Sequence, residues 1–273
     1  GFGMSLTINN DSAIGFALIA LSRSSSLMNE AMERLSSGKR INRASDDPAG
    51  IHRVIRLNAE IRGINTASRN AADGQSLVDT LDTSLSEVQS ILLRMRELTI
   101  QAMSDTNSAD DRLALDSELS QLELEITRIG STTSFGGKPV FDGNTHYLQI
   151  GPRSGNTLEI QSYTLSAATL GLNQDLTSRG NAENYLGIID TAIQNINEKR
   201  GAAGALSNRL DFIMSNLDNS KVNLIKSRSN IEDADFAAES MKLAKAKILE
   251  QVAIAMIAQA NARMQWILKL LEN

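Results

Sequence analysis

SDDPAGIHRVIRLNAEIRGINTASRNAADGQSLVDTLDTSLSEVQSILLRMRELTIQA, residues 45–102, carries apolar residues that alternate in steps of three and four. This is the period of a coiled coil. Ser45 or Asp46 can cap the start of a helix, and Pro48 fits its first turn. The pattern predicts one helix of about 55 residues, on the order of 80 Å long, with Gly74 as a possible break. The predicted seam is Val54, Leu57, Ile61, Ile64, Ser68, Ala71, Gln75, Val78, Leu85, Val88, Leu92, Met95, Leu98 and Ala102.

Two more segments continue this helical spacing. Leu115, Leu119, Leu122, Ile126 and Ile129 repeat the step pattern and stop at Gly130. The short link at 105–108 predicts an antiparallel hairpin of helices. Helical spacing resumes near Ala182 and runs to Ile231, so a third long helix is expected.

The segment at about 131–180 differs in character. Gly136-Gly137-Lys138-Pro139 and Asp142-Gly143 are typical of turns. Residues 147–150 and 157–160 alternate apolar and polar side chains, which predicts a β-hairpin. The segment is therefore expected to be a small β insert in a mainly α protein.

The two ends of the chain are the most informative pair of segments. Both carry helix-spaced apolar residues, although they lie more than 200 residues apart. The C-terminal stripe is broad, so a helix there must bury more than one side, and copies of the same chain could cover it. The predicted self-assembly residues are Ile14, Leu18, Leu21, Met28, Met32 and Leu35 at one end, and Ile248, Val252, Met256, Ala260, Met264, Ile267 and Leu271 at the other.

We therefore expect a mainly α, elongated rod of long antiparallel coiled-coil helices with a small β insert and paired terminal helices. Residues 1–44 and 234–273 would form a domain of terminal helices, and residues 45–233 a rod domain. A rod whose ends present unsatisfied apolar stripes points to assembly and not to catalysis.

The composition argues against several other functional classes of protein. With 27 basic and 32 acidic residues, the net charge of −5 gives no basic field for nucleic acid. There is no cysteine, and the two histidines, His52 and His146, have no metal-ligand neighbours in sequence. We predict no enzyme activity, catalytic residue, metal or cofactor. No apolar run reaches the roughly 18 residues of a membrane span, and no secretory signal is evident.

Five motifs in order resemble those of bacterial flagellin, and the similarity covers nearly the whole chain. They are RLSSGKRINRASDDPAG at 34–50, LRMRELTIQ at 93–101, TSFGGKPVFDG at 133–143, SNIEDADFAAE at 229–239, and AMIAQAN at 255–261 followed by LKLL at 268–271. The resemblance implies a filament subunit whose terminal helices form an inner tube, with the insert facing outward. It also implies export through the flagellar secretion apparatus, a secretion chaperone, a filament cap, hook-junction proteins, and a location in the extracellular bacterial flagellum.

The resemblance adds one more candidate site and leaves alternatives open. Arg94, Leu98 and Glu118 match positions that a vertebrate Toll-like receptor recognises in many flagellins, but charged helix faces and a core leucine explain the same residues. Two other functions fit the helical pattern: a hook–filament junction protein and a non-flagellar coiled-coil adaptor.

Overall fold

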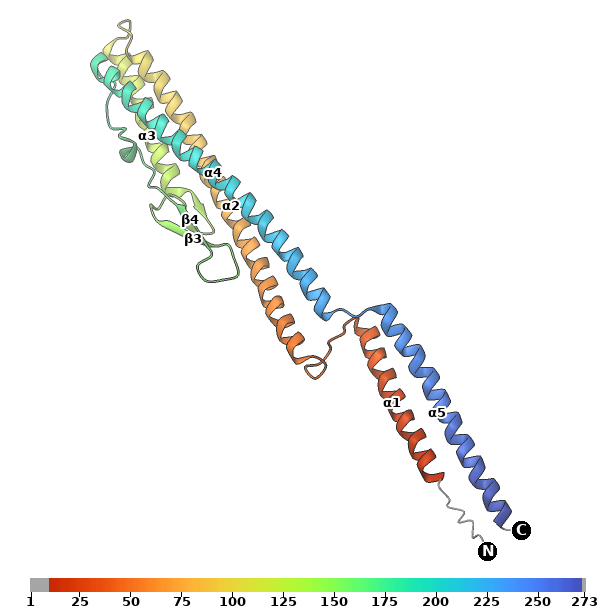
Figure 1. The fold of residues 1–273 in the computed structure, drawn as a ribbon. Helices are drawn as coiled ribbons and strands as arrows, with labels where there is room; N and C mark the ends of the chain where they lie inside the picture. Colours follow the sequence, from red (N-terminus) through yellow and green to blue (C-terminus); the bar gives the residue numbers. More distant parts are fainter. Residues whose placement is uncertain (1–9, 272–273) are drawn as a thin grey trace. The chain divides into compact units, whose positions relative to one another are not determined.

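The computed structural model describes the backbone of residues 10–271, and the side chains of residues 14–263, 265 and 266. It forms two compact units: one joins the two ends of the chain, up to Ala59 and from Leu224, and the other comprises Glu60–Asn223. Figure 1 shows long helices and a small strand insert, so the predicted mainly α fold is confirmed. The helices are α1 (Asn10–Ser37), α2 (Pro48–Ala102), α3 (Ala109–Thr132), α4 (Arg179–Glu232) and α5 (Phe236–Leu271).

Within the unit at 60–223, α2 is antiparallel to both α3 and α4. Arg96 contacts Asp190, whereas Gln75, a more N-terminal residue of α2, contacts Ser207 of α4. Asp82 and Gln89 both accept hydrogen bonds from Arg200. Polar side chains therefore fix the register of α2 against α4 along several turns.

The apolar seam of α2 forms the core of this unit. Leu85, Val88, Leu92, Met95 and Leu98 are all buried, as the three–four period predicts. Opposite them lie Leu119 and Ile126 of α3 with Ile189 and Ile196 of α4. Of the predicted seam residues, only Leu57, Ser68 and Gln75 stay partly exposed.

The insert packs on α2 at two glycines. Its strands are β1 (Ser134–Phe135) paired with β2 (Lys138–Pro139), and β3 (Thr145–Gln149) paired antiparallel with β4 (Thr157–Gln161). A Cβ at Gly74 would lie 2.8 Å from Leu148 of β3, and one at Gly63 would lie 2.7 Å from Pro152 of the hairpin loop. The possible break at Gly74 does not occur, since α2 is continuous. Glycine there allows close approach of the hairpin.

Two helix boundaries differ from the sequence-based expectation. Asp47, not Ser45 or Asp46, caps α2: its carboxylate accepts the Gly50 N–H at 2.8 Å. Asp46 instead accepts the N–H groups of Asn42 and Arg43, which lower its pKa. At the other boundary, α3 continues past Gly130 to Thr132. A Cβ at Gly130 would meet the carbonyl oxygen of Leu165 at 1.9 Å, so this glycine also serves a close contact.

Candidate assembly surface on the terminal helices

In the unit formed by the chain ends, α1 and α5 pack antiparallel through small residues. Ser24 and Ala31 of α1, with Ala246 and Ala253 of α5, are buried. Ser25 reaches Glu250, and Arg34 reaches Glu239, which sets the antiparallel direction. The two helices of one chain therefore pair along a narrow seam that buries few large side chains.

Most of the large apolar residues of these helices remain exposed. A soluble chain does not usually leave so many on one pair of helices, and exposed apolar patches of this kind mark interaction sites. The exposed residues are Phe16, Leu18, Ile19, Leu27 and Met32 of α1, and Phe236, Met241, Ile248, Leu249, Val252, Ile254, Met256 and Trp266 of α5. We call these residues the terminal apolar surface.

The predicted self-assembly residues divide between the seam and this surface. Leu18 and Met32 of α1 and Ile248, Val252 and Met256 of α5 are exposed. The remaining α1 candidates, Ile14, Leu21, Met28 and Leu35, and Ala260 of α5 are half-buried. The side chains of Met264, Ile267 and Leu271 lie outside those that the structure describes. Whether these residues mediate assembly stays a prediction.

Some exposed apolar residues of α1 lie outside the stripe that the sequence predicts. Phe16, Ile19 and Leu27 do not lie on it, yet they are exposed apolar residues of the same helix. The sequence does show these residues, because α1, like α5, carries apolar residues at positions between those of the stripe. A search for residues spaced by three and four positions alone does not include them.

A groove of about 640 Å³ runs between α1 and α5 on this surface. Phe16 and Leu27 line it from α1, and Leu249, Val252 and Met256 from α5. Arg23 and Lys245 add two cations to the lining. An apolar helix with an acidic or hydroxyl-bearing edge has the shape and chemistry to lie in such a groove.

Backbone hydrogen bonds join the segment between α1 and α2 to the segment between α4 and α5. Arg40 N–H donates to the Glu232 carbonyl at 2.7 Å, and Ala234 N–H donates to the Gly38 carbonyl at 2.9 Å. Gly38 has a φ of +70°, which favours glycine at this turn. The segments 34–50 and 229–239, noted as separate motifs in the sequence, thus form one structural joint.

Two buried carboxylates are paired at this joint. Glu232 lies 2.6 Å from Lys39, and Glu239 lies 2.7 Å from Lys242 and 3.3 Å from Arg34. Burial raises the pKa of Glu239, but the hydrogen bonds and charges of Lys242 and Arg34 outweigh it, so the net pKa is lowered. Of these pairs, Arg34–Glu239 joins α1 to α5, whereas Lys39–Glu232 joins the segment after α1 to the end of α4.

The three candidate receptor-contact residues lie where α2 meets α3. Arg94 is exposed and bonds Glu118 across the two helices at 2.8 Å and Glu97 on its own helix at 3.1 Å. Leu98 is buried in the core. Arg94 and Glu118 therefore offer a surface and Leu98 does not, and receptor binding stays a prediction.

The described residues offer no arrangement typical of an enzyme site. His146 pairs with Asp142 at 3.3 Å, and hydrogen bonds from Asn144 are the main cause that lowers the pKa of Asp142 to about 2. No group of three potential metal ligands occurs among the residues whose side chains are described.

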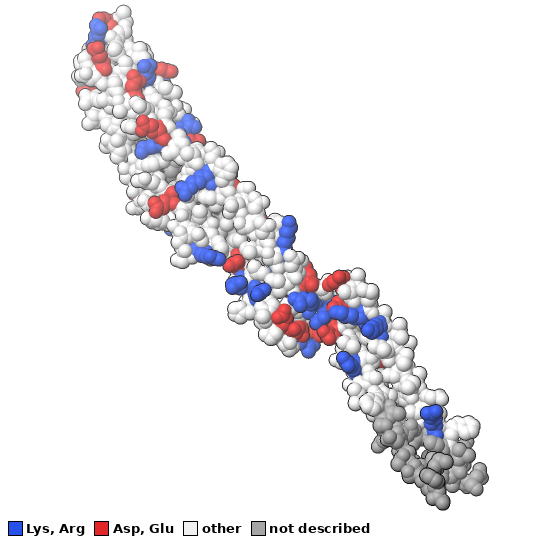
Figure 2. All heavy atoms as spheres, in the orientation of Figure 1, with Lys and Arg blue, Asp and Glu red and all other residues white. Residues whose placement is uncertain are grey.

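In that same part of the chain, every helix is too short or too polar to cross a bilayer. Figure 2 shows acidic and basic atoms interspersed on the visible face, with no broad basic field.

Long helices with a buried apolar core, and a pair of terminal helices whose large apolar residues are mostly exposed, are typical of structural proteins that associate with other copies. Comparison with known proteins specifies the family. The model of the bacterial flagellin N-terminal helical region matches residues 8–146, and that of the C-terminal helical region matches residues 186–271. This chain belongs to the bacterial flagellin family.

Individual relatives agree with this assignment. A flagellin of Halalkalibacterium halodurans is 43% identical over 247 residues, which cover 89% of this chain and 91% of the relative. The flagellar filament 33 kDa core protein of Treponema phagedenis is 33% identical over 285 residues, covering 97% of this chain and all of the relative.

Solved structures show the same fold. The crystal structure of Bacillus cereus flagellin has a TM-score of 0.51 and 36% identity, covering 55% of this chain and 88% of that one. A putative flagellar hook-associated protein from Vibrio parahaemolyticus has a TM-score of 0.60 at 17% identity, covering 69% of this chain and all of that one. The latter likeness concerns the fold alone.

Proposed function

We propose that this chain is a structural subunit of the bacterial flagellar filament and polymerises through its terminal helices. The observation that carries the proposal is the terminal apolar surface: α1 and α5 bury small residues against each other and leave Phe16, Ile248 and Met256 in solvent. Burial of such side chains against other copies is the main source of association free energy. The family assignment supports the same conclusion.

We propose that the two parts of the chain occupy different layers of the filament. Residues 1–44 and 234–273 would form the inner tube of the filament, residues 45–233 the surrounding layer, and the insert at about 131–180 its outer face. A filament requires contacts between unlike patches, because identical patches facing each other close into a dimer. An exposed α1–α5 pair with different residues on each helix provides unlike patches.

The proposal includes delivery to the outside of the cell. The chain would be exported through the flagellar secretion apparatus, held by a chaperone that covers the apolar face of α5, and added beneath the filament cap. The absence of cysteine means that no disulfide has to form after export. The proposed location is therefore the extracellular flagellum, and the proposed role is mechanical and not enzymatic.

Seeded growth tests the proposal. Purified chain is mixed with short filament fragments of the same protein, and elongation is followed by electron microscopy and light scattering. We expect seeds to lengthen and then depolymerise on heating. A coiled-coil adaptor would not lengthen seeds. Failure to elongate at any concentration would refute the proposed function.

A further inference from the structure

The terminal apolar surface carries all the methionine thioethers that are exposed among the described side chains. Met241 and Met256 of α5 are 68% and 61% exposed, and Met32 of α1 is 42% exposed. The other methionines with described side chains are buried or partly buried: Met28, Met95, Met103 and Met214. An oxidant in solvent therefore reaches methionine sulfur most easily on the surface that is proposed to mediate assembly.

The two exposed methionines of α5 belong to one row of apolar residues. Met241, Ile248, Val252 and Met256 follow each other at intervals of seven, four and four residues, so they lie within about 80° of arc around the helix. Met256 also lines the groove between α1 and α5. A second copy that buries this row would therefore cover both thioethers.

Met32 extends the same arrangement to α1. Arg34 of α1 bonds Glu239 of α5. Met32 precedes Arg34 by two residues and Met241 follows Glu239 by two, so the antiparallel pairing places the two methionines at the same level. Met256 lies about 22 Å further along α5. The oxidisable side chains thus occur at two separate levels of the terminal apolar surface.

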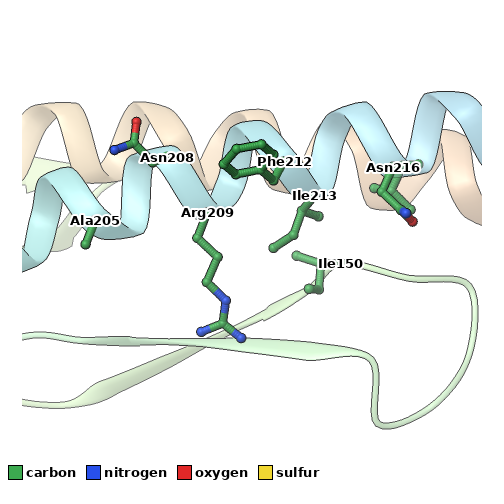
Figure 3. A pocket seen from close by; sticks show the side chains of 8 residues that line it. Ile150, Ala205, Asn208, Arg209, Phe212, Ile213 and Asn216 are labelled. Atoms are coloured by element: carbon green, nitrogen blue, oxygen red, sulfur yellow. The ribbon is translucent and has the colours of Figure 1, made fainter.

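A second apolar groove, in the unit at 60–223, provides a contrast. It has a volume of about 490 Å³ and lies between α4 and the end of the β3–β4 hairpin (Figure 3). Phe212 is 77% exposed on its α4 wall, and Ile213 and Ile150 point toward each other. The described residues that line this groove include no methionine, and Met214 of α4 packs against the core instead. Methionine oxidation therefore distinguishes the terminal apolar surface from this groove.

A peroxide converts a methionine thioether to a sulfoxide in one balanced step. The sulfur lone pair attacks one peroxide oxygen, the S–O bond forms as the O–O bond breaks, and the second oxygen leaves as water after proton transfer. Sulfur is oxidised and the peroxide is reduced. The sulfoxide is polar, and burying it without a hydrogen-bond donor costs free energy, so the modification opposes apolar contacts.

We infer that Met32, Met241 and Met256 form an oxidative modification site of the unassembled chain, and that their sulfoxides keep the chain out of the polymer. This inference rests on the proposed function, because it requires other copies to cover the terminal apolar surface. The polymer covers the same sulfur atoms, so a peroxide acts on free chains and spares assembled ones. Methionine sulfoxide reductases, with a dithiol as electron donor, reverse the step.

Peroxide treatment of single chains and of filaments tests the access to these sulfur atoms. Both samples are treated with hydrogen peroxide and digested, and the oxygen gained at each methionine is measured by mass spectrometry. We expect Met32, Met241 and Met256 to be oxidised at least about tenfold faster in single chains than in filaments. Met95, which is buried in the single chain, is the internal control and should react slowly in both. Equal rates in single chains and filaments at the three exposed positions would overturn the inference.

Seeded elongation tests the effect on assembly. Peroxide should raise the critical concentration of the parent chain at least about tenfold, and the reductases should restore it. A triple variant, Met32→Leu, Met241→Leu and Met256→Leu, conserves apolar volume and should elongate equally with and without peroxide. The matched control carries three leucines at partly buried methionines and should respond to peroxide as the parent does; its changes are Met28→Leu, Met103→Leu and Met214→Leu.

Normal elongation of the oxidised parent, or an equal loss in the triple variant, would overturn the inference. If the untreated triple variant does not assemble, partly oxidised parent chain is grown on seeds. Sulfoxide at positions 32, 241 and 256 should then be depleted in the filaments relative to the soluble remainder, and equal content would overturn the inference. Failure of the untreated parent chain to lengthen seeds would instead refute the proposed function, so the two failures are distinguishable.

Discussion

Replacing the exposed row Ile248, Val252 and Met256 with serine should abolish assembly at working concentrations while the chain stays folded. The three side chains are 60%, 52% and 61% exposed in the single chain. Full burial of such side chains stabilises by about 1.5–3 kcal/mol each. The exposed fractions then correspond to about 3–5 kcal/mol per subunit in the polymer. Since 1.4 kcal/mol is a factor of ten, the critical concentration should rise roughly a hundred- to several-thousand-fold.

The assay is the soluble concentration that remains after seeded polymerisation reaches equilibrium, measured by sedimentation. A matched control carries serine at Lys247, Gln251 and Ala255, the exposed neighbours one position earlier. The control loses about 0.5 kcal/mol or less of helix propensity per position, whereas serine matches isoleucine and valine in propensity. A larger defect in the Ile248, Val252 and Met256 variant therefore comes from the apolar contact. If the two variants polymerise at the same critical concentration, the terminal apolar surface does not mediate assembly.

Three further predictions concern other parts of the chain. Because the pKa of Glu239 is lowered in the fold, its stabilising contribution is present near neutral pH and is lost as pH falls below about 4.3 through the folded pKa. Glu239→Gln should therefore flatten the acid side of the plot of melting temperature against pH, measured by circular dichroism. An unchanged plot would contradict this prediction. Gly130→Ala should destabilise by about 1–3 kcal/mol in urea unfolding because its Cβ has no room, while Gly201→Ala, with open space around it, should stabilise by about 0.5–1 kcal/mol. In a Toll-like receptor reporter assay, Arg94→Ala should lower the response several-fold relative to Arg128→Ala, and an inactive parent chain would end that hypothesis.

The long helices could be predicted because their buried residues recur every third or fourth position. In α2 every third or fourth residue from Val78 to Ala102 meets another helix, and the sequence repeats at the same interval. The strands β3 and β4 could be predicted for a similar reason, because alternation in 157–160 places Leu158 and Ile160 on the buried side. Local pattern and burial coincide in these elements.

The contacts at glycines could not be predicted from local pattern. From sequence alone, Gly74 is expected to break a helix and Gly130 to end one, because glycine has a low intrinsic helix propensity. Their function depends on Leu148 and Leu165, residues that reach them only in the folded chain. The groove between α4 and the β3–β4 hairpin could not be predicted for the same reason, because Ile150 meets Ile213 of α4 only in the folded chain (Figure 3).

The two helix systems of this chain reach stability by different routes. In the unit at 60–223, the helices bury leucine, isoleucine and methionine against each other, so that unit contains a core of its own. Between α1 and α5 the buried seam is alanine and serine, whose transfer from water contributes little. Helix pairs gain most of their stability from packing of an apolar face. The terminal pair is therefore expected to gain its main packing free energy from other copies, and its stability should rise with protein concentration while that of the other unit does not.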